Sequence, residues 1–291
     1  ASYTIPSSVT AIRYYGFAGN KFLTSLDIPN TVTDLEGQNF TNSERIATIN
    51  IGTGLSNLGE QSFAYIQTLS AINVNPSNTY VASIDGVLYS KDISTLWAYP
   101  IGKTATSYTA PNTVTATKYT VFGQASNLLT VDLTSVATLS GQEFESSTSI
   151  REITFGNSLT QLKNQTLQSA SGLQKLYLGT GLTTITNGAF WGNTSLNCVV
   201  YAGSNPTIQN YAYPNGVVPV ANSSCLADSV SSLTPTVTPI IANAYRAESL
   251  GTVYFAPLSS KLSTAAKKKI EAAIIANPSA VYKITGYVQK S

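Results

Sequence analysis

Apolar side chains recur along residues 3–202 with a period of 22 or 23 residues. One column of this pattern is aromatic or leucine, and its successive members are separated by 23, 23, 59, 22, 23 and 23 residues. The column consists of Phe17, Phe40, Phe63, Phe122, Phe144, Leu167 and Phe190. A unit this short cannot bury its apolar face alone, so neighbouring units must stack on one another. The pattern predicts a repeat solenoid with one continuous hydrophobic core.

A second column is an apolar pair separated by one residue, and it occurs once in each unit. The pairs are Leu26/Ile28, Ile49/Ile51, Ile72/Val74, Val131/Leu133, Ile153/Phe155, Leu176/Leu178 and Val199/Tyr201. Because successive side chains of a strand point to opposite faces, each pair predicts a short strand with one face turned inward. We therefore expect one short strand per unit.

The 59-residue interval indicates an insertion of extra residues, at about 75–103, between two units. Residues 85–92 and 96–100 read as two alternating strands around a Lys-Asp turn, with Pro100 closing the second strand. The sequence predicts that a β-hairpin is inserted into the solenoid here.

The repeat, together with the Asp-Gly-Val-Leu-Tyr-Ser-Lys-Asp segment at 85–92 and Tyr-Pro-Ile-Gly-Lys at 99–103, resembles the BspA-like leucine-rich repeat family. The resemblance covers residues 3–202. It implies a right-handed leucine-rich-repeat coil and a protein of bacterial cell surfaces, where members of the family include adhesins and host-matrix binders. Most members carry Ala-Phe at the aromatic position, and here Ala189-Phe190 alone matches that pair.

Composition favours a secreted surface protein. Charged residues make up 10% of the chain and the net charge is +2, so the surface offers little for nucleic acid or an anionic membrane. No apolar run approaches the twenty or so residues of a membrane-spanning helix. The chain starts at Ala1 and contains no methionine, which predicts a cleaved secretory signal and an extracellular location.

The chain has two cysteines, Cys198 and Cys225, and both lie where the repeats end. Residues 203–227 are predicted to fold back as a C-terminal cap over the last coil, held by a Cys198–Cys225 disulfide. A catalytic or metal-binding thiol is the alternative, but a metal site needs three or four ligands and the chain has no histidine. We expect no metal and no cofactor.

Beyond the cap, residues 228–250 read as a linker and residues 251–291 as a different module. A strand at 252–255, a helix at 264–276 and a strand at 281–287 resemble the first half of an OmpA-like domain, a type that often docks on peptidoglycan. Ala256-Pro257 replaces the acidic residue common in that family, so no peptidoglycan-binding residue is carried over. The module is expected to associate with the bacterial envelope.

Catalysis has few candidate residues in this chain. Without histidine, acid-base work would fall to carboxylates, and Glu143 and Glu145 are the closest pair in the sequence. They flank the inward Phe144, so we expect both to leave the coil into solvent. A carbohydrate-active enzyme is therefore an alternative that the sequence disfavours, and the chain is predicted not to be an enzyme.

Recognition is then expected on the outward side of the strands. The predicted ligand-binding residues on this strand face are Asp27, Asn50, Asn73, Thr109, Asp132, Thr154, Tyr177, Glu152 and Lys175. Such a polar row suits a sugar polymer or an extended polypeptide, although it would also serve simply to keep the sheet soluble. The leading hypothesis is adhesion or ligand binding to a host or environmental protein or glycan. The alternative is a structural protein that assembles into a coat or fibre.

Overall fold

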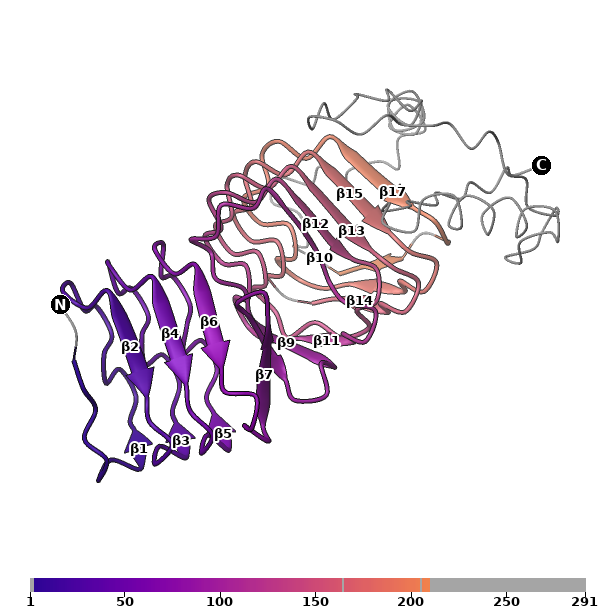
Figure 1. Cartoon of the computed structure of the whole chain (residues 1–291). Helices are drawn as coiled ribbons and strands as arrows, with labels where there is room; N and C mark the ends of the chain where they lie inside the picture. The colour runs from indigo at the N-terminus through magenta and orange to yellow at the C-terminus, as the bar shows by residue number, and fades with distance from the viewer. Residues whose placement is uncertain (1–2, 164, 205, 210–291) are drawn as a thin grey trace, which may run out of the picture. The chain divides into compact units, whose positions relative to one another are not determined.

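The computed structural model describes residues 3–163, 165–204 and 206–209 (Figure 1). These residues form eighteen short strands, arranged in stacked coils, and no helix. The expected linker, the strand-helix-strand module and Cys225 lie outside the described residues, as does most of the expected cap. The described part of the chain is the solenoid.

The first coils present two parallel sheets on different sides. One sheet contains β2 (Ser25–Ile28), β4 (Thr48–Ile51) and β6 (Ala71–Val74), and the other contains β1 (Ala11–Ile12), β3 (Asp34–Leu35) and β5 (Asn57–Leu58). The expectation of one strand per unit was wrong, because the apolar residue seven positions after each pair, such as Leu35, lies in a second, two-residue strand. Each coil therefore has two straight sides.

The later coils repeat this plan. Their longer strands form a five-stranded parallel sheet, in which β10 (Ser107–Thr109), β12 (Thr130–Leu133), β13 (Glu152–Phe155), β15 (Lys175–Leu178) and β17 (Cys198–Tyr201) follow in order. The short strands β14 (Gln161–Leu162), β16 (Thr184–Ile185) and β18 (Thr207–Ile208) form a second sheet. In Figure 1, the group with β2, β4 and β6 is followed along the chain by the group with β10, β12, β13, β15 and β17.

Antiparallel strands separate the two groups of coils. β7 (Val81–Ile84), β8 (Val87–Ser90) and β9 (Thr95–Ala98) pair in succession, and β9 then pairs in parallel with β11 (Ala116–Thr117). The Lys91–Asp92 turn joins β8 to β9. A second turn, Asp85-Gly86, joins β7 to β8, and both of its residues have positive φ, as a type I′ turn requires. Asp85 was expected to lie within a strand and instead makes this turn.

The hydrophobic core is divided at this point, so the expectation of one continuous core was wrong. Leu88 of β8 packs in the cluster of the first coils, whereas Val87 and Tyr89 pack in the cluster of the later coils. All three side chains are buried. Because neighbouring residues of a strand point to opposite faces, β8 gives one apolar face to each group of coils.

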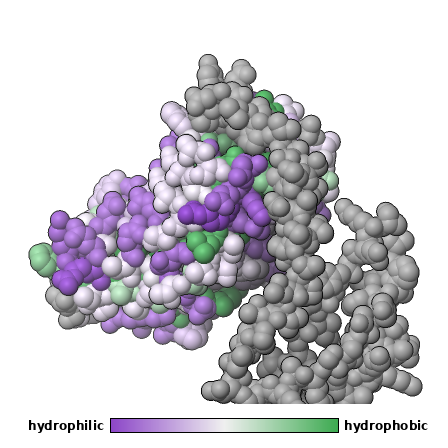
Figure 2. Space-filling model, turned by 90° about the horizontal axis from the view of Figure 1, so that it is seen from above, coloured by the Kyte–Doolittle hydropathy of each residue, from purple (hydrophilic) through white to green (hydrophobic). Residues whose placement is uncertain are grey.

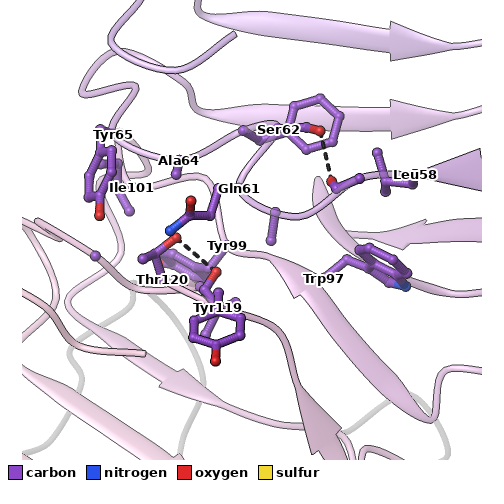
Figure 3. A pocket seen from close by; sticks show the side chains of 15 residues that line it. Leu58, Gln61, Ser62, Ala64, Tyr65, Trp97, Tyr99, Ile101, Tyr119 and Thr120 are labelled. Carbon is purple, nitrogen blue, oxygen red and sulfur yellow. Dashed lines mark hydrogen bonds between the residues drawn. The ribbon is translucent and has the colours of Figure 1, made fainter. Parts of the chain in front are cut away.

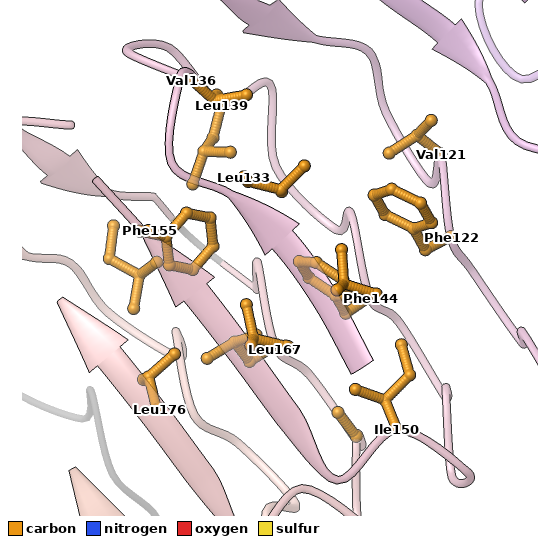
Figure 4. Close-up of a cluster of buried hydrophobic side chains, with 14 of the residues drawn as sticks. Val121, Phe122, Leu133, Val136, Leu139, Phe144, Ile150, Phe155, Leu167 and Leu176 are labelled. Atoms are coloured by element: carbon orange, nitrogen blue, oxygen red, sulfur yellow. The ribbon is translucent and has the colours of Figure 1, made fainter. Parts of the chain in front are cut away.

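Within each group, the aromatic column stacks as the period predicts. The rings of Phe17 and Phe40 and those of Phe40 and Phe63 are each 5.6 Å apart and nearly parallel. Phe122 and Phe144 stack in the same way at 5.1 Å (Figure 4). Phe40, Phe122 and Phe144 are wholly buried. Burial of this column contributes much of the driving force for coil stacking.

Each aromatic turn is built on two left-handed residues, two positions before and two after the aromatic one. The earlier column is Tyr15, Gln38, Gln61, Thr120, Gln142, Gln165 and Gly188, and the later one is Gly19, Asn42, Tyr65, Gln124, Ser146, Ser169 and Gly192. These residues turn the chain so that the backbone N–H of Phe40 reaches the carbonyl of Ser62, 2.9 Å away in the next coil. The same bond joins Phe144 to Thr166.

Candidate functional site

The nine predicted strand-face residues lie on two separate sheets. Asp27, Asn50 and Asn73 are register neighbours on β2, β4 and β6. The other six lie on the five-stranded sheet: Thr109, Asp132, Thr154 and Tyr177 form one row, and Glu152 and Lys175 lie two positions earlier. The structure thus brings three of the nine together in one group and six in another.

The first group is joined by hydrogen bonds between its side chains. The Asn50 amide donates to Asp27 Oδ1 at 2.6 Å, and the Asn73 amide donates to Asn50 Oδ1 at 2.9 Å. We call this row the Asp27–Asn73 ladder. In both bonds, the amide of one coil donates to the side chain of the preceding coil, so each side chain is held in a fixed orientation. The 23-residue period produces the ladder, because it places Asp27, Asn50 and Asn73 at the same position of successive coils.

A groove of about 320 Å³ runs beside this ladder. Its walls are the three ladder residues, the strand ends and the residues just after them: Asp27, Ile28, Asn50, Ile51, Gly52, Asn73, Val74 and Asn75. The groove is shallow and open to solvent, unlike the enclosed clefts that bury most of a small molecule. The aspartate is the one ionisable group among the lining residues, so the groove has acidic character.

The second group differs from the first in its bonding. Asp132 Oδ1 accepts hydrogen bonds from the backbone N–H and the hydroxyl of Thr134, two residues on, and so caps its own loop. Glu152 and Lys175 are register neighbours of opposite charge on β13 and β15. Thr154 and Tyr177 differ in size and chemistry, so this row has no repeated rung.

Figure 2 shows a face of the molecule on which hydrophilic and neutral residues predominate and hydrophobic ones are scattered.

The two glutamates that flank Phe144 do not form an exposed pair. Glu143 is wholly buried, where its Oε1 accepts hydrogen bonds from the Gly141 N–H at 2.8 Å and the Thr117 hydroxyl at 3.0 Å. Burial raises the pKa of Glu143 above its ordinary value. Glu145 accepts a 2.5 Å bond from the Tyr65 hydroxyl across the division between the coil groups. The expectation that both carboxylates reach solvent together was wrong.

A small hollow lies where the two groups of coils meet (Figure 3). Its lining includes Tyr65, Trp97, Tyr99, Tyr119 and Thr120, but its volume is about 20 Å³, which holds about one water molecule. The Lys118 ammonium lies 4.6 Å from the centre of the Trp97 ring and 3.4 Å from Glu60 Oε1. The residues around the hollow hold the two groups of coils together, and the hollow itself is too small for a substrate.

Three other kinds of residue could in principle form a site: cysteines, exposed aromatic residues and metal ligands. Cys198 is buried in β17, while Cys225 lies outside the described residues, so the disulfide stays a prediction. Tyr14, Tyr15 and Trp191, which sit near the apolar register, are more than half exposed. In the part of the chain that the structure describes, no three His, Cys, Asp or Glu side chains gather as a metal site would require. Across the same residues, no helix has the length and hydropathy of a membrane span.

Solved structures share this fold. A leucine-rich cell surface protein from Faecalibacterium prausnitzii matches with a TM-score of 0.56 and 24% identity over 70% of this chain and 60% of that protein. The chain thus spans about three fifths of its length. A leucine-rich repeat protein from Eubacterium ventriosum gives 0.50 and 18% over 75% and 85% of the two chains. The pneumococcal vaccine antigen PcpA gives 0.52 and 19% over 79% and 76%.

No curated protein sequence matches the chain. A family model described as "BspA type Leucine rich repeat region (6 copies)" matches residues 1–94 and 101–217, which is most of the chain. The match covers both groups of coils and the aromatic, strand and polar columns described above. The protein belongs to the BspA-type leucine-rich repeat family.

Proposed function

We propose that this protein is a secreted bacterial surface protein that mediates adhesion or ligand binding through the strand face of its solenoid. The observation that carries the proposal is the Asp27–Asn73 ladder, whose pre-oriented polar groups line a groove of about 320 Å³ on a hydrogen-bonded sheet. Sites built on strands hold their side chains more firmly than sites on loops. A groove fixed before binding reduces the entropy lost when a ligand is ordered.

The family context supports a binding role. The Faecalibacterium protein is described as a cell surface protein and the pneumococcal one as a vaccine antigen. Repeat solenoids use extended surfaces for recognition. No catalytic family is indicated, and the closest carboxylates in the sequence, Glu143 and Glu145, are separated into a buried site and a structural hydrogen bond.

Two further parts of the chain complete the proposal. Residues 251–291 hold the protein at the envelope, with peptidoglycan as the expected partner. A Cys198–Cys225 disulfide fastens the cap on the last coil in the oxidising extracellular compartment. Incubation of the intact chain with insoluble peptidoglycan tests the first part, since the protein should sediment with it. Mass spectrometry of the unreduced protein tests the second, because the disulfide lowers the mass by two hydrogens.

The binding role is tested with the intact chain against immobilised matrix proteins and glycans. At least one polymer should bind with a dissociation constant below millimolar, and Asn50→Leu should weaken that binding, because leucine keeps the branched shape of the side chain but removes its hydrogen-bond donors and acceptor. Asn57→Leu is the matched control. Asn57 donates to Asp34 Oδ1 at 2.8 Å in the same kind of pair, but on the sheet of β3 and β5, outside the groove. A broad panel without any such ligand would count against the proposed function.

A further inference from the structure

The groove beside the Asp27–Asn73 ladder has the chemistry of a site for hydroxyl groups. An Asn side chain has two N–H donors and an oxygen with two lone pairs. The ladder bonds use one donor of Asn50, one donor of Asn73 and one lone pair of Asn50 Oδ1. A donor and an acceptor then remain at the Asn50 and Asn73 rungs, and acceptors alone remain at Asp27. Hydroxyl groups, which both donate and accept, match such rungs.

The charge of the groove disfavours anionic ligands. Asp27 is its one ionisable lining residue, and no Lys or Arg is among the residues that line it. A sulfated, phosphorylated or uronic acid polymer would meet a carboxylate without a compensating cation. A neutral polymer meets no such repulsion. Ile28 and Ile51, which also border the groove, have side chains buried in the core, so the polar rungs are what the groove offers a ligand.

The spacing of the rungs fits the repeat of a linear glycan better than that of an extended peptide. Neighbouring strands lie about 4.8 Å apart, so the third rung is about 9.6 Å from the first. An extended peptide presents side chains on one face every two residues, or about 6.6 Å, and reaches its third same-face side chain only after about 13.2 Å. The peptide therefore loses register within the groove. A pyranose ring in an extended linear glycan is close in length to one rung spacing.

The sheet itself also leaves little for a peptide strand to pair with. β4 is hydrogen-bonded to β2 on one side and to β6 on the other. On the open side of β6, the Ile72 N–H donates to the Gly86 carbonyl and the Val74 N–H donates to the Ser83 hydroxyl. Strand addition, the usual way in which a sheet edge captures a peptide, thus lacks these two donors.

We propose that the ligand of this groove is a neutral linear glycan, bound across β2, β4 and β6 with one sugar unit at each rung of the Asp27–Asn73 ladder. This assignment rests on the proposed binding function and specifies its ligand class. Asn50, as the middle rung, contacts the glycan directly. Asp27 orients the ladder and excludes anionic sugars.

The test is a calorimetric titration of the intact chain with hexasaccharides of glucose, mannose, xylose and N-acetylglucosamine, and with a galacturonic acid hexamer as the anionic probe. At least one neutral hexasaccharide should bind below millimolar, and the anionic probe at least tenfold more weakly. Asn50→Leu should weaken the neutral sugar at least tenfold, whereas Asn57→Leu should change it less than twofold. Asp27→Asn removes the charge and keeps an acceptor for Asn50. It should reduce the ratio between the dissociation constants of the anionic and the neutral hexasaccharides.

The other outcomes each overturn the assignment in a distinct way. If no neutral sugar binds but an extended protein binds and is sensitive to Asn50→Leu, the glycan assignment fails while the proposed function stands. If a sugar binds equally well to Asn50→Leu, its site is not this groove. If neither sugars nor proteins bind, the glycan assignment and the proposed function fail together. Unchanged thermal unfolding of each variant shows that a loss of binding is not a loss of fold.

Discussion

The two groups of coils share one backbone plan but carry different polar rows on it. In the first, Asp27, Asn50 and Asn73 bond to one another from strand to strand. In the second, the corresponding Asp132 bonds instead to Thr134 of its own loop, and the next rungs are Thr154 and Tyr177. The backbone register is therefore not what makes a site. The difference arises from which side chains repeat, and a ladder forms where like amides recur at one position.

The buried aromatic stacks should be equally important on both sides of the division. Phe40→Ala and Phe144→Ala each remove a wholly buried ring that packs on its neighbours. Each should lower the free energy of unfolding by about 3–5 kcal/mol, as measured in urea. A loss below about 1 kcal/mol in one variant would show that the corresponding column does not hold its coils together.

Two glycines offer a matched pair for the turn after the long strand. A Cβ on Gly54 would lie 1.9 Å from the Asn30 carbonyl oxygen, and one on Gly181 would lie 2.0 Å from that of Asn157. In each turn the preceding backbone N–H, of Thr53 or Thr180, also donates to the side-chain Oδ1 of the same asparagine. Gly54→Ala and Gly181→Ala should each cost about 1–3 kcal/mol in thermal unfolding. Unequal losses would mean that the two turns are not equivalent.

The buried Glu143 gives the second group of coils a pH dependence. Its pKa is raised in the folded protein, chiefly by burial, from an ordinary value of 4.5. Stability is therefore fully retained below about pH 4.5 and declines as the pH rises through the folded pKa, because the folded state resists ionisation.

Glu143→Gln keeps the acceptor for Gly141 and Thr117 and cannot ionise. At pH 8 it should be more stable than the parent protein by about 1–3 kcal/mol, the usual cost of a poorly satisfied buried polar group. The advantage should shrink toward pH 4.5 in parallel denaturation series. An advantage that does not vary with pH would contradict the assignment of this effect to ionisation.

The smallest expected effect concerns the bond across the division. Tyr65→Phe removes the hydroxyl that donates to Glu145 and leaves the ring in place. Because both side chains are partly exposed, we expect a loss of about 0.5–1.5 kcal/mol. Tyr119→Phe, in the same hollow, is the control for ring hydroxyls that have no such role. If both variants lower the free energy of unfolding equally, the Tyr65–Glu145 bond does not help to join the two groups of coils.

The aromatic column and the rungs could be predicted from the sequence because both follow from one period. Phe40 stacks on Phe63, and Asn50 lies beside Asp27, as a 23-residue repeat requires. The second strand of each coil was missed because two residues such as Asp34-Leu35 are too short to show alternation. The Asp85-Gly86 turn had a signal, since Asp-Gly between apolar runs is typical of a hairpin.

Other features depend on three-dimensional contacts that no local pattern carries. Glu143 and Glu145 were expected to leave the coil together, as residues on either side of an inward one do in a strand. They lie instead in a turn in which Gln142 and Ser146 adopt left-handed conformations, so strand alternation does not apply. The divided core likewise depends on β8 giving Leu88 to one side and Tyr89 to the other.

The comparison between the two polar rows is tested most directly by hydrogen exchange of the intact chain with and without its ligand. The account predicts slower exchange on binding in residues 25–28, 48–52 and 71–75, the strands and strand ends that carry the Asp27–Asn73 ladder and its groove. Residues 130–133, 152–155 and 175–178 should be unchanged. Protection confined to those later strands would contradict the account, because it would place the binding site on the row without a ladder.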